Sequence, residues 1–245
     1  MAWAEQTTLS SGGRTKRWND VILCDALSPH RYRNMVIPAR QLLSEEVDEL
    51  ASQAMQFYGS TDRWVVDSYF PLPPTDRLVI DGYETVMCFP RGPVEVPEVN
   101  GLRIKEVTDD KTMDEFESTW AKTFTSQLLK PGASRYDIRI LGSGQRLWVG
   151  YMEGYPIATS GSYVSHGLNL VRAVTVLPDF RGRGVAKALS RCAMAASYYP
   201  RFLNSHPPAE GFWKSMGFHG VSTFQYWMWN LLLPTVLRST RATTK

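Results

Sequence analysis

Apolar residues recur every three to four positions across residues 41–58, a spacing that places them on one face of an α-helix. The same spacing predicts a helix over residues 114–124, in which Phe116, Trp120 and Phe124 share a face. Both predicted helices are therefore amphipathic, and we expect each to pack its apolar side against a core.

Shorter runs of apolar and β-branched residues alternate with turn signals and predict β-strands. The predicted strands cover residues 63–70, 84–89, 102–107, 146–152, 157–164, 169–176, 201–206 and 221–229. Short helices are expected over residues 78–83 and 136–141, and a longer one from residue 185 to about residue 199. This mixture of elements predicts an α/β fold.

A proline- and glycine-rich stretch over residues 90–101 is the best candidate for a linker between two parts of the chain. We therefore expect an N-terminal region over residues 18–95 and a C-terminal domain over residues 101–230. Residues 1–17 are rich in Ser, Thr and Gly and are predicted to form a flexible tail, and residues 231–245 a second tail.

The most informative stretch is residues 171–186, where an apolar, β-branched run leads into a segment rich in glycine and arginine. Glycines let a backbone approach a ligand closely, and the first amides of a helix lack internal partners and carry partial positive charge. A pyrophosphate can bind there, with Arg181 and Arg183 beside it. The spacing matches neither the Walker sequence nor G-x-G-x-x-G, which argues against nucleoside triphosphates and nicotinamide cofactors. The alternative is that Gly182 and Gly184 serve only a strand-to-helix turn.

This stretch resembles the signature of the GCN5-related N-acetyltransferase (GNAT) family: a strand, a proline-containing turn, [Q/R]-x-x-G-x-[G/A] and a helix. Arg181, Gly184 and Ala186 occupy the signature positions. Residues 210–218 resemble the family's second signature, a short helix that ends in a Gly-Phe pair, and the two signatures come in the family's order. The resemblance implies a GNAT fold, with a mixed, mostly antiparallel sheet that is splayed at the acyl-CoA site and flanked by helices. Residues 18–95 are either a degenerate GNAT-like half that holds no coenzyme or an extension of another shape.

The resemblance also implies an acetyl-CoA-dependent N-acetyltransferase, in which a neutral amine attacks the thioester directly. Backbone groups of Val174, Thr175 and Val176 are expected to bind the pantetheine arm, and the N–H of Val174 or Val176 to polarise the thioester carbonyl. The diphosphate is expected on the turn formed by Arg181, Gly182, Arg183, Gly184, Val185 and Ala186. A non-catalytic acyl-CoA-binding protein of this fold and a transferase of a longer acyl group are the alternatives.

Many members of the family use a tyrosine of the short helix as the acid that protonates the leaving thiolate. This chain carries Trp213 at that position, and an indole N–H is not a useful acid near neutral pH. Trp213 is expected to cover the pantetheine or to pack in the core. His206 is the candidate for proton transfer, because its ordinary pKa of about 6.5 suits neutral conditions. Ser205 is the second candidate, as a proton donor or as a hydrogen-bond partner of the pantetheine.

Composition narrows the classes of partner. The 245-residue chain is 43% hydrophobic and 21% charged, as soluble globular proteins are. Its net charge of +3 and the lack of a basic stretch with interleaved aromatics argue against nucleic acid. Cys24, Cys88 and Cys192 are far apart, which argues against a metal site and disulfides and suits a reducing, cytoplasmic location. No apolar run has the length of a membrane span. The expected acceptor is the amine of a small molecule or short peptide.

Overall fold

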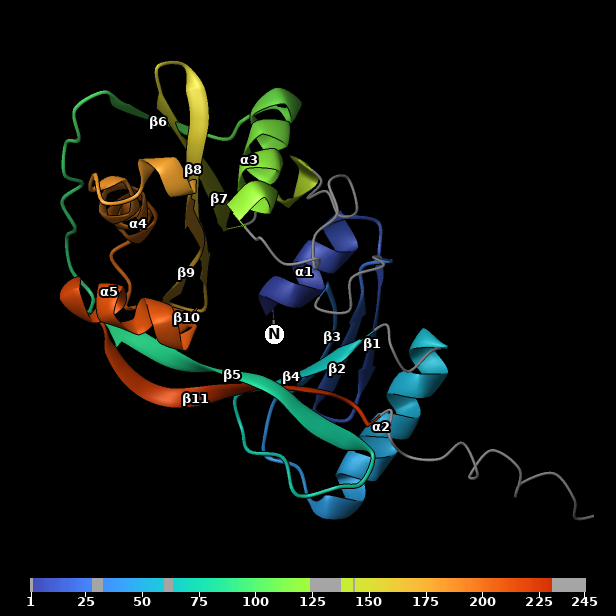
Figure 1. Cartoon of the computed structure of the whole chain (residues 1–245). Helices are drawn as coiled ribbons and strands as arrows, with labels where there is room; N and C mark the ends of the chain where they lie inside the picture. Colours follow the sequence, from blue (N-terminus) through green and yellow to red (C-terminus); the bar gives the residue numbers. More distant parts are fainter. Residues whose placement is uncertain (1, 28–32, 60–63, 124–137, 143, 231–245) are drawn as a thin grey trace, which may run out of the picture.

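The computed structural model describes residues 2–27, 33–59, 64–123, 138–142 and 144–230 (Figure 1). Over these residues the strands form one sheet in the order β1-β2-β3-β4-β11-β5-β10-β9-β8-β7-β6. The strands are β1 (Arg14–Trp18), β2 (Val21–Asp25), β3 (Asn34–Pro38), β4 (Val65–Ser68), β5 (Leu78–Phe89), β6 (Leu102–Glu106), β7 (Gln145–Met152), β8 (Tyr155–Ser165), β9 (Leu168–Val176), β10 (Arg201–Ser205) and β11 (His219–Trp229). The α-helices are α1 (Ala2–Ser10), α2 (Ser44–Tyr58), α3 (Asp110–Thr123), α4 (Val185–Ala195) and α5 (Glu210–Ser215). The predicted mixed, mostly antiparallel α/β fold is confirmed.

The same connectivity occurs twice along the chain. β2 and β3 are antiparallel, α2 follows them, and β4 then pairs in parallel with β3. Likewise β8 and β9 are antiparallel, α4 follows them, and β10 then pairs in parallel with β9. A crossover helix is what allows two neighbouring strands to run parallel. Each of the two parallel pairs joins at two positions before its strands diverge.

The two parts of the chain are interleaved at the centre of the sheet. β5, from the N-terminal part, lies between β10 and β11 and is antiparallel to both. β11, the last strand of the C-terminal part, lies between β5 and β4. Strands β5 and β11 therefore each pair with strands of the other part of the chain. Figure 1 shows the long ribbon that β5 and β11 form between the two parts.

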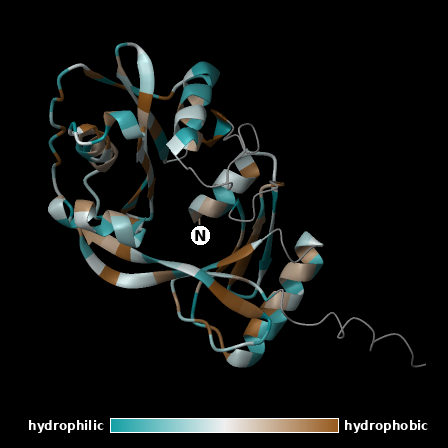
Figure 2. Ribbon diagram, viewed as in Figure 1, coloured by the Kyte–Doolittle hydropathy of each residue, from teal (hydrophilic) through white to brown (hydrophobic). Residues whose placement is uncertain are grey.

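Two main cores hold the crossover helices against the sheet. Leu189 and Ala193 of α4 pack with Trp148 and Ile157 of the C-terminal part. The second core packs Val47, Leu50 and Ala54 of α2 against Val36 and Val66. Hydrophobic residues lie along the strands next to α2 (Figure 2). Each core uses one apolar face of an amphipathic helix, as the spacing of its residues predicts.

A buried arginine fixes the segment that joins the two parts. The Arg201 side chain donates hydrogen bonds to the carbonyls of Pro90 (3.1 Å), Gly92 (2.7 Å), Ser197 (2.5 Å) and Met194 (3.0 Å). Only 1% of this residue is exposed. Such a network satisfies both the buried charge and carbonyls that would otherwise lack partners. The proline-rich segment is thereby held against the start of β10.

Several predicted elements differ from the structure. Residues 78–83 are the start of the long strand β5, not a short helix, because β11 pairs with this segment. Residues 1–17 are not a flexible tail where they are described: α1 buries Ala4 and Thr8, and β1 pairs with β2. The helix expected over residues 136–141 is a 3₁₀ turn at Ile138–Ile140 in the described part. The expected tail at residues 231–245 lies outside the described residues.

Candidate active site

A glycine-rich turn connects β9 to α4. Gly182 and Gly184 have φ angles of +75° and +81°, in the left-handed region that glycine adopts without strain. The Ala188 N–H donates to the Gly184 carbonyl at 3.1 Å, and this bond opens α4. The amides of the helix's first turn therefore have no partner within the helix and carry partial positive charge. The turn is exposed and presents several donors to an anion.

Two arginines flank this turn. Arg181 Nε donates to the Val176 carbonyl at 3.1 Å, which ties the turn to the end of β9. Arg183 Nη2 donates to the Asp179 carbonyl at 3.2 Å, and its guanidinium lies 5.4 Å from the centre of the Phe180 ring. Both residues are exposed. Their contacts orient two positive charges beside the unpaired amides without neutralising them.

β9 and β10 separate next to this turn. Their parallel pairing ends where Leu170 meets Phe202, although both strands continue further. Ala173 has a φ of +51°, and the register between β8 and β9 shifts at this point, which marks a β-bulge. The Ala173 carbonyl accepts a hydrogen bond from Thr159 Oγ1 at 2.7 Å. The splay leaves an edge of β9 beside β10 to which an extended ligand can pair as an added strand.

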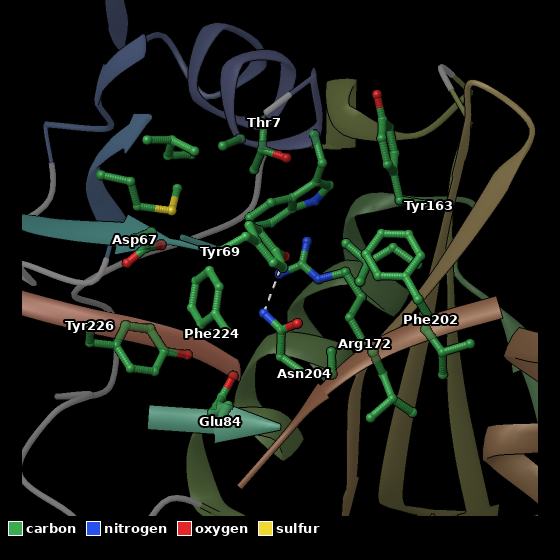
Figure 3. A pocket seen from close by; sticks show the side chains of 18 of the residues that line it. Thr7, Asp67, Tyr69, Glu84, Tyr163, Arg172, Phe202, Asn204, Phe224 and Tyr226 are labelled. Atoms are coloured by element: carbon green, nitrogen blue, oxygen red, sulfur yellow. Dashed lines mark hydrogen bonds between the residues drawn. The ribbon is translucent and has the colours of Figure 1, made fainter. Parts of the chain in front are cut away.

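A cavity of about 1120 Å³ opens at the splay. Strands β4, β5 and β11 line one side, and β8, β9 and β10 line the other (Figure 3). Helix α1 also lines it through Trp3, whose Nε1 donates to Gln145 Oε1 at 3.2 Å. The Arg172 guanidinium lies 3.7 Å from the centre of the Trp3 indole. The cavity therefore lies between the two parts of the chain.

His206 and Glu84 lie in contact at this cavity. His206 Nε2 lies 2.8 Å from Glu84 Oε1, and the side chains are 68% and 7% exposed. The hydrogen bond to Glu84 raises the pKa of His206, and partial burial opposes this rise. The pair joins the end of β10 to β5, and it places a titratable imidazole at the mouth of the splay.

A second carboxyl group, Asp67, lies on the same side of the cavity. Asp67 sits on β4 opposite Tyr226 of β11, and Glu84 sits on β5 opposite Phe224 of β11. Directly opposed residues project to the same face of a sheet, and so do residues two positions apart. Burial, and then the charge of Glu84, raise the pKa of Asp67 well above its ordinary value. Tyr226 forms a hydrogen bond with Glu84.

The residues predicted from the signature lie together around the splay and the turn. Val176 and Val185 are buried, Val174 and Ala186 are half-buried, and Thr175 Oγ1 lies 2.8 Å from Thr159 Oγ1. Ser205 lines the cavity, but its hydroxyl donates to the His206 carbonyl at 3.1 Å.

Trp213 packs in the core and also lines the cavity. The residue is 7% exposed and packs in the core with Phe212 and Phe218, at ring-centre distances of 4.9 and 5.4 Å. It also contributes to the lining of the cavity. The indole is therefore held by neighbouring rings at the wall of the site.

Sequence reasoning missed the acidic side of this cavity. Asp67 and Glu84 are 17 positions apart and are brought together by strands that pair through β11, so no local spacing connects them. The available signal was a carboxylate within the apolar run Trp64-Val65-Val66-Asp67, since a charged residue in a buried strand is uncommon away from a functional site.

The part of the chain that the structure describes contains neither a metal-binding cluster nor a membrane-spanning helix. No three His, Cys, Asp or Glu side chains there cluster closely enough to hold a metal ion. Likewise, no helix within those residues has the length and apolar character needed to cross a membrane.

Comparison with known proteins connects this geometry to a family. Residues 143–220 match the model of the acetyltransferase (GNAT) domain. The chain is similar in structure to a GCN5-related N-acetyltransferase from Kribbella flavida, with a TM-score of 0.69 and 14% identity over 91% of each chain. It is also similar to a GCN5-related N-acetyltransferase from Sphaerobacter thermophilus, with a TM-score of 0.53 and 17% identity over 80% of this chain and 72% of the other. No curated protein has a sequence that matches this chain significantly.

A further similar structure contains two GNAT units. It is a tandem GNAT protein from the clavulanic acid biosynthesis pathway, with a TM-score of 0.56 and 13% identity over 84% of this chain and 77% of the other. These similarities show that the chain as a whole has the GNAT fold, and residues 143–220 match a GNAT domain.

Proposed function

We propose that the protein is an acetyl-CoA-dependent N-acetyltransferase that acts on the amine of a small molecule or short peptide. The observation that supports this most strongly is the convergence of three features at one place: a turn with unpaired amides and two arginines, a splayed parallel pair, and a cavity with a titratable imidazole. Each feature alone has a structural explanation. Together they fit an anionic, extended coenzyme and an amine that approaches from the cavity.

Residues of the C-terminal part would bind the diphosphate and the pantetheine arm of the coenzyme. The amides from Gly182 to Ala186, with Arg181 and Arg183, would hold the diphosphate. The exposed edge of β9 would pair with the pantetheine amides, and the N–H of Val174 or Val176 would stabilise negative charge on the carbonyl oxygen. Acetyl-CoA supplies the activated acyl group.

His206 is the residue we assign to proton transfer. An ammonium acceptor must lose a proton before its nitrogen can attack, and a neutral imidazole near the splay can accept that proton. Glu84 holds the ring in place and stabilises the imidazolium that forms. As the amide forms, the attacking nitrogen releases its second proton to water, and the leaving thiolate recovers a proton from the imidazolium. Trp213 cannot supply it, because an indole N–H is too weak an acid.

We also infer that the N-terminal part is a GNAT-like half that does not bind coenzyme. In the repeated connectivity, the segment between β3 and α2 corresponds to the phosphate turn between β9 and α4. There, Arg40 Nη2 and Nη1 bind both carboxylate oxygens of Glu46 at 2.6 and 2.9 Å, and Glu46 also accepts a bond from the Leu43 N–H at 2.8 Å. Arg40 lowers the pKa of Glu46 to about 2. An internal carboxylate therefore occupies the start of α2, where a phosphate would otherwise bind.

Calorimetric titration with acetyl-CoA, free CoA and a longer acyl-CoA tests this proposal, followed by a thiol-release assay with a panel of amines. One binding site per chain and turnover with an amine are the expected results. Binding without turnover by any amine would favour a non-catalytic acyl-CoA-binding protein, and no binding of any of the three compounds would refute the coenzyme site.

His206→Ala is expected to lower turnover at least tenfold with little change in coenzyme affinity. Wild-type turnover by this variant would remove His206 from the mechanism.

A further inference from the structure

The acidic side of the cavity contains a carboxyl group that the proposed reaction does not use. Asp67 is 9% exposed, and its Oδ1 is buried without a hydrogen-bond partner among the described residues. A buried polar atom of this kind costs free energy unless a partner arrives. Because Asp67 lines the cavity, that partner can be a bound ligand.

The surroundings of Asp67 select for positive charge. Tyr69 and Phe224 have ring centres 4.6 Å apart, and Phe224 and Tyr226 have ring centres 4.9 Å apart. Burial raises the pKa of Tyr69 to about 12, so its phenol stays neutral. Figure 3 shows these rings beside Asp67 and Glu84, on the side of the cavity formed by β4, β5 and β11. Aromatic faces next to carboxyl groups bind ammonium and guanidinium groups.

The order of the strands sets the distance between Asp67 and the amine that would react beside His206. Glu84, the partner of His206, lies on β5, and Asp67 lies on β4, with β11 between the two strands. Neighbouring strands are roughly 4.8 Å apart, so these two positions are about 10 Å apart across the sheet. One small ammonium group does not span both positions, whereas an acceptor with two separated cationic groups does.

We propose that the acceptor is a dicationic amine, in which one nitrogen reacts beside His206 while a second ammonium or guanidinium group binds Asp67 among Tyr69, Phe224 and Tyr226. This inference rests on the proposed function, since it concerns the acceptor of that same site. Burial and the charge of Glu84 raise the pKa of Asp67, and an arriving cation would favour its carboxylate form. Arg172, one of the arginines that line the cavity, stacks on Trp3.

The test compares two amines of equal chain length, hexane-1,6-diamine and 1-aminohexane, titrated calorimetrically into protein saturated with CoA. The diamine is expected to bind at least about tenfold more tightly, as one buried charged contact would give. Asp67→Asn preserves the shape of the side chain and is expected to remove this preference. Asp81→Asn is the matched control: Asp81 lines the same cavity but is exposed, so the variant loses the same formal charge and is expected to keep the preference.

Each other outcome has a definite meaning. Equal affinity for the two amines, no binding of the diamine, or a preference that persists in Asp67→Asn would overturn the dicationic acceptor. If CoA binds normally in those cases, the proposed transferase function stands without it. If CoA does not bind, the proposed function fails, and the same amine titration without CoA still tests the Asp67 site. Thermal unfolding of each variant checks that the fold is intact.

Discussion

Replacing Gly184 with valine separates the role of the phosphate turn in binding from its role in folding. Gly184 has a φ of +81°, and a Cβ built there lies 3.5 Å from Val99 Cγ2, an ordinary contact. Gly154, in the turn between β7 and β8, has a φ of +82° and open space around its Cβ position. The two sites therefore impose nearly the same backbone strain on valine, roughly 1–2 kcal/mol. For a chain of this length that corresponds to a fall in Tm of about 2–8 °C.

Only Gly184→Val is expected to lose coenzyme affinity. A side chain at this position shifts the amides that open α4, and losing one hydrogen bond to a charged group costs about 1.5–3 kcal/mol. Affinity for CoA should therefore fall about tenfold to a hundredfold, since each 1.4 kcal/mol is a factor of ten. Calorimetry and thermal unfolding on both variants provide the two readouts. Unchanged CoA affinity in Gly184→Val, or an equal loss in Gly154→Val, would refute the assignment of the phosphate site.

Three further predictions follow from contacts described above. Glu84→Gln removes the charge that raises the pKa of His206, so the acidic limb of the pH–rate profile should move to lower pH; a limb that stays in place would exclude His206 as the titrating base. Arg201→Met removes four hydrogen bonds to backbone carbonyls and should destabilise the fold by about 3 kcal/mol or more, as measured by denaturant unfolding; a loss below about 1 kcal/mol would show that those bonds contribute little. Removing residues 1–95 deletes β5 and should leave no cooperatively folded domain, as judged by circular dichroism and a thermal melt.

The features that could be predicted from the sequence are those encoded by neighbouring residues. The strand that ends at Val176, the Gly182–Gly184 turn and the helix after it all follow from short-range patterns, and the structure confirms these elements. His206, at the end of the predicted strand 201–206, is a candidate because of the ordinary pKa of histidine, and it does line the cavity.

The remaining features depend on pairing between distant segments. Residues 78–83 become a strand because β11 pairs with them, although the segment alone was read as a helix. The meeting of Asp67 and Glu84 follows from strand order rather than from spacing along the chain. Tertiary context of this kind overrides local preference, and a single sequence contains no direct record of it.

The position of β11 between β4 and β5 affects how the protein folds during its synthesis. β11 follows every other described strand along the chain, so the partner that covers both β4 and β5 emerges from the ribosome after the rest of the sheet. Until then the N-terminal sheet has an open edge, which is a hazard for aggregation. Its pairings are also far apart in sequence, which slows folding. The synthesis of one late strand therefore commits both parts to their final form in a single event, and a chain truncated before Phe224 would have neither a finished sheet nor the aromatic wall of the cavity.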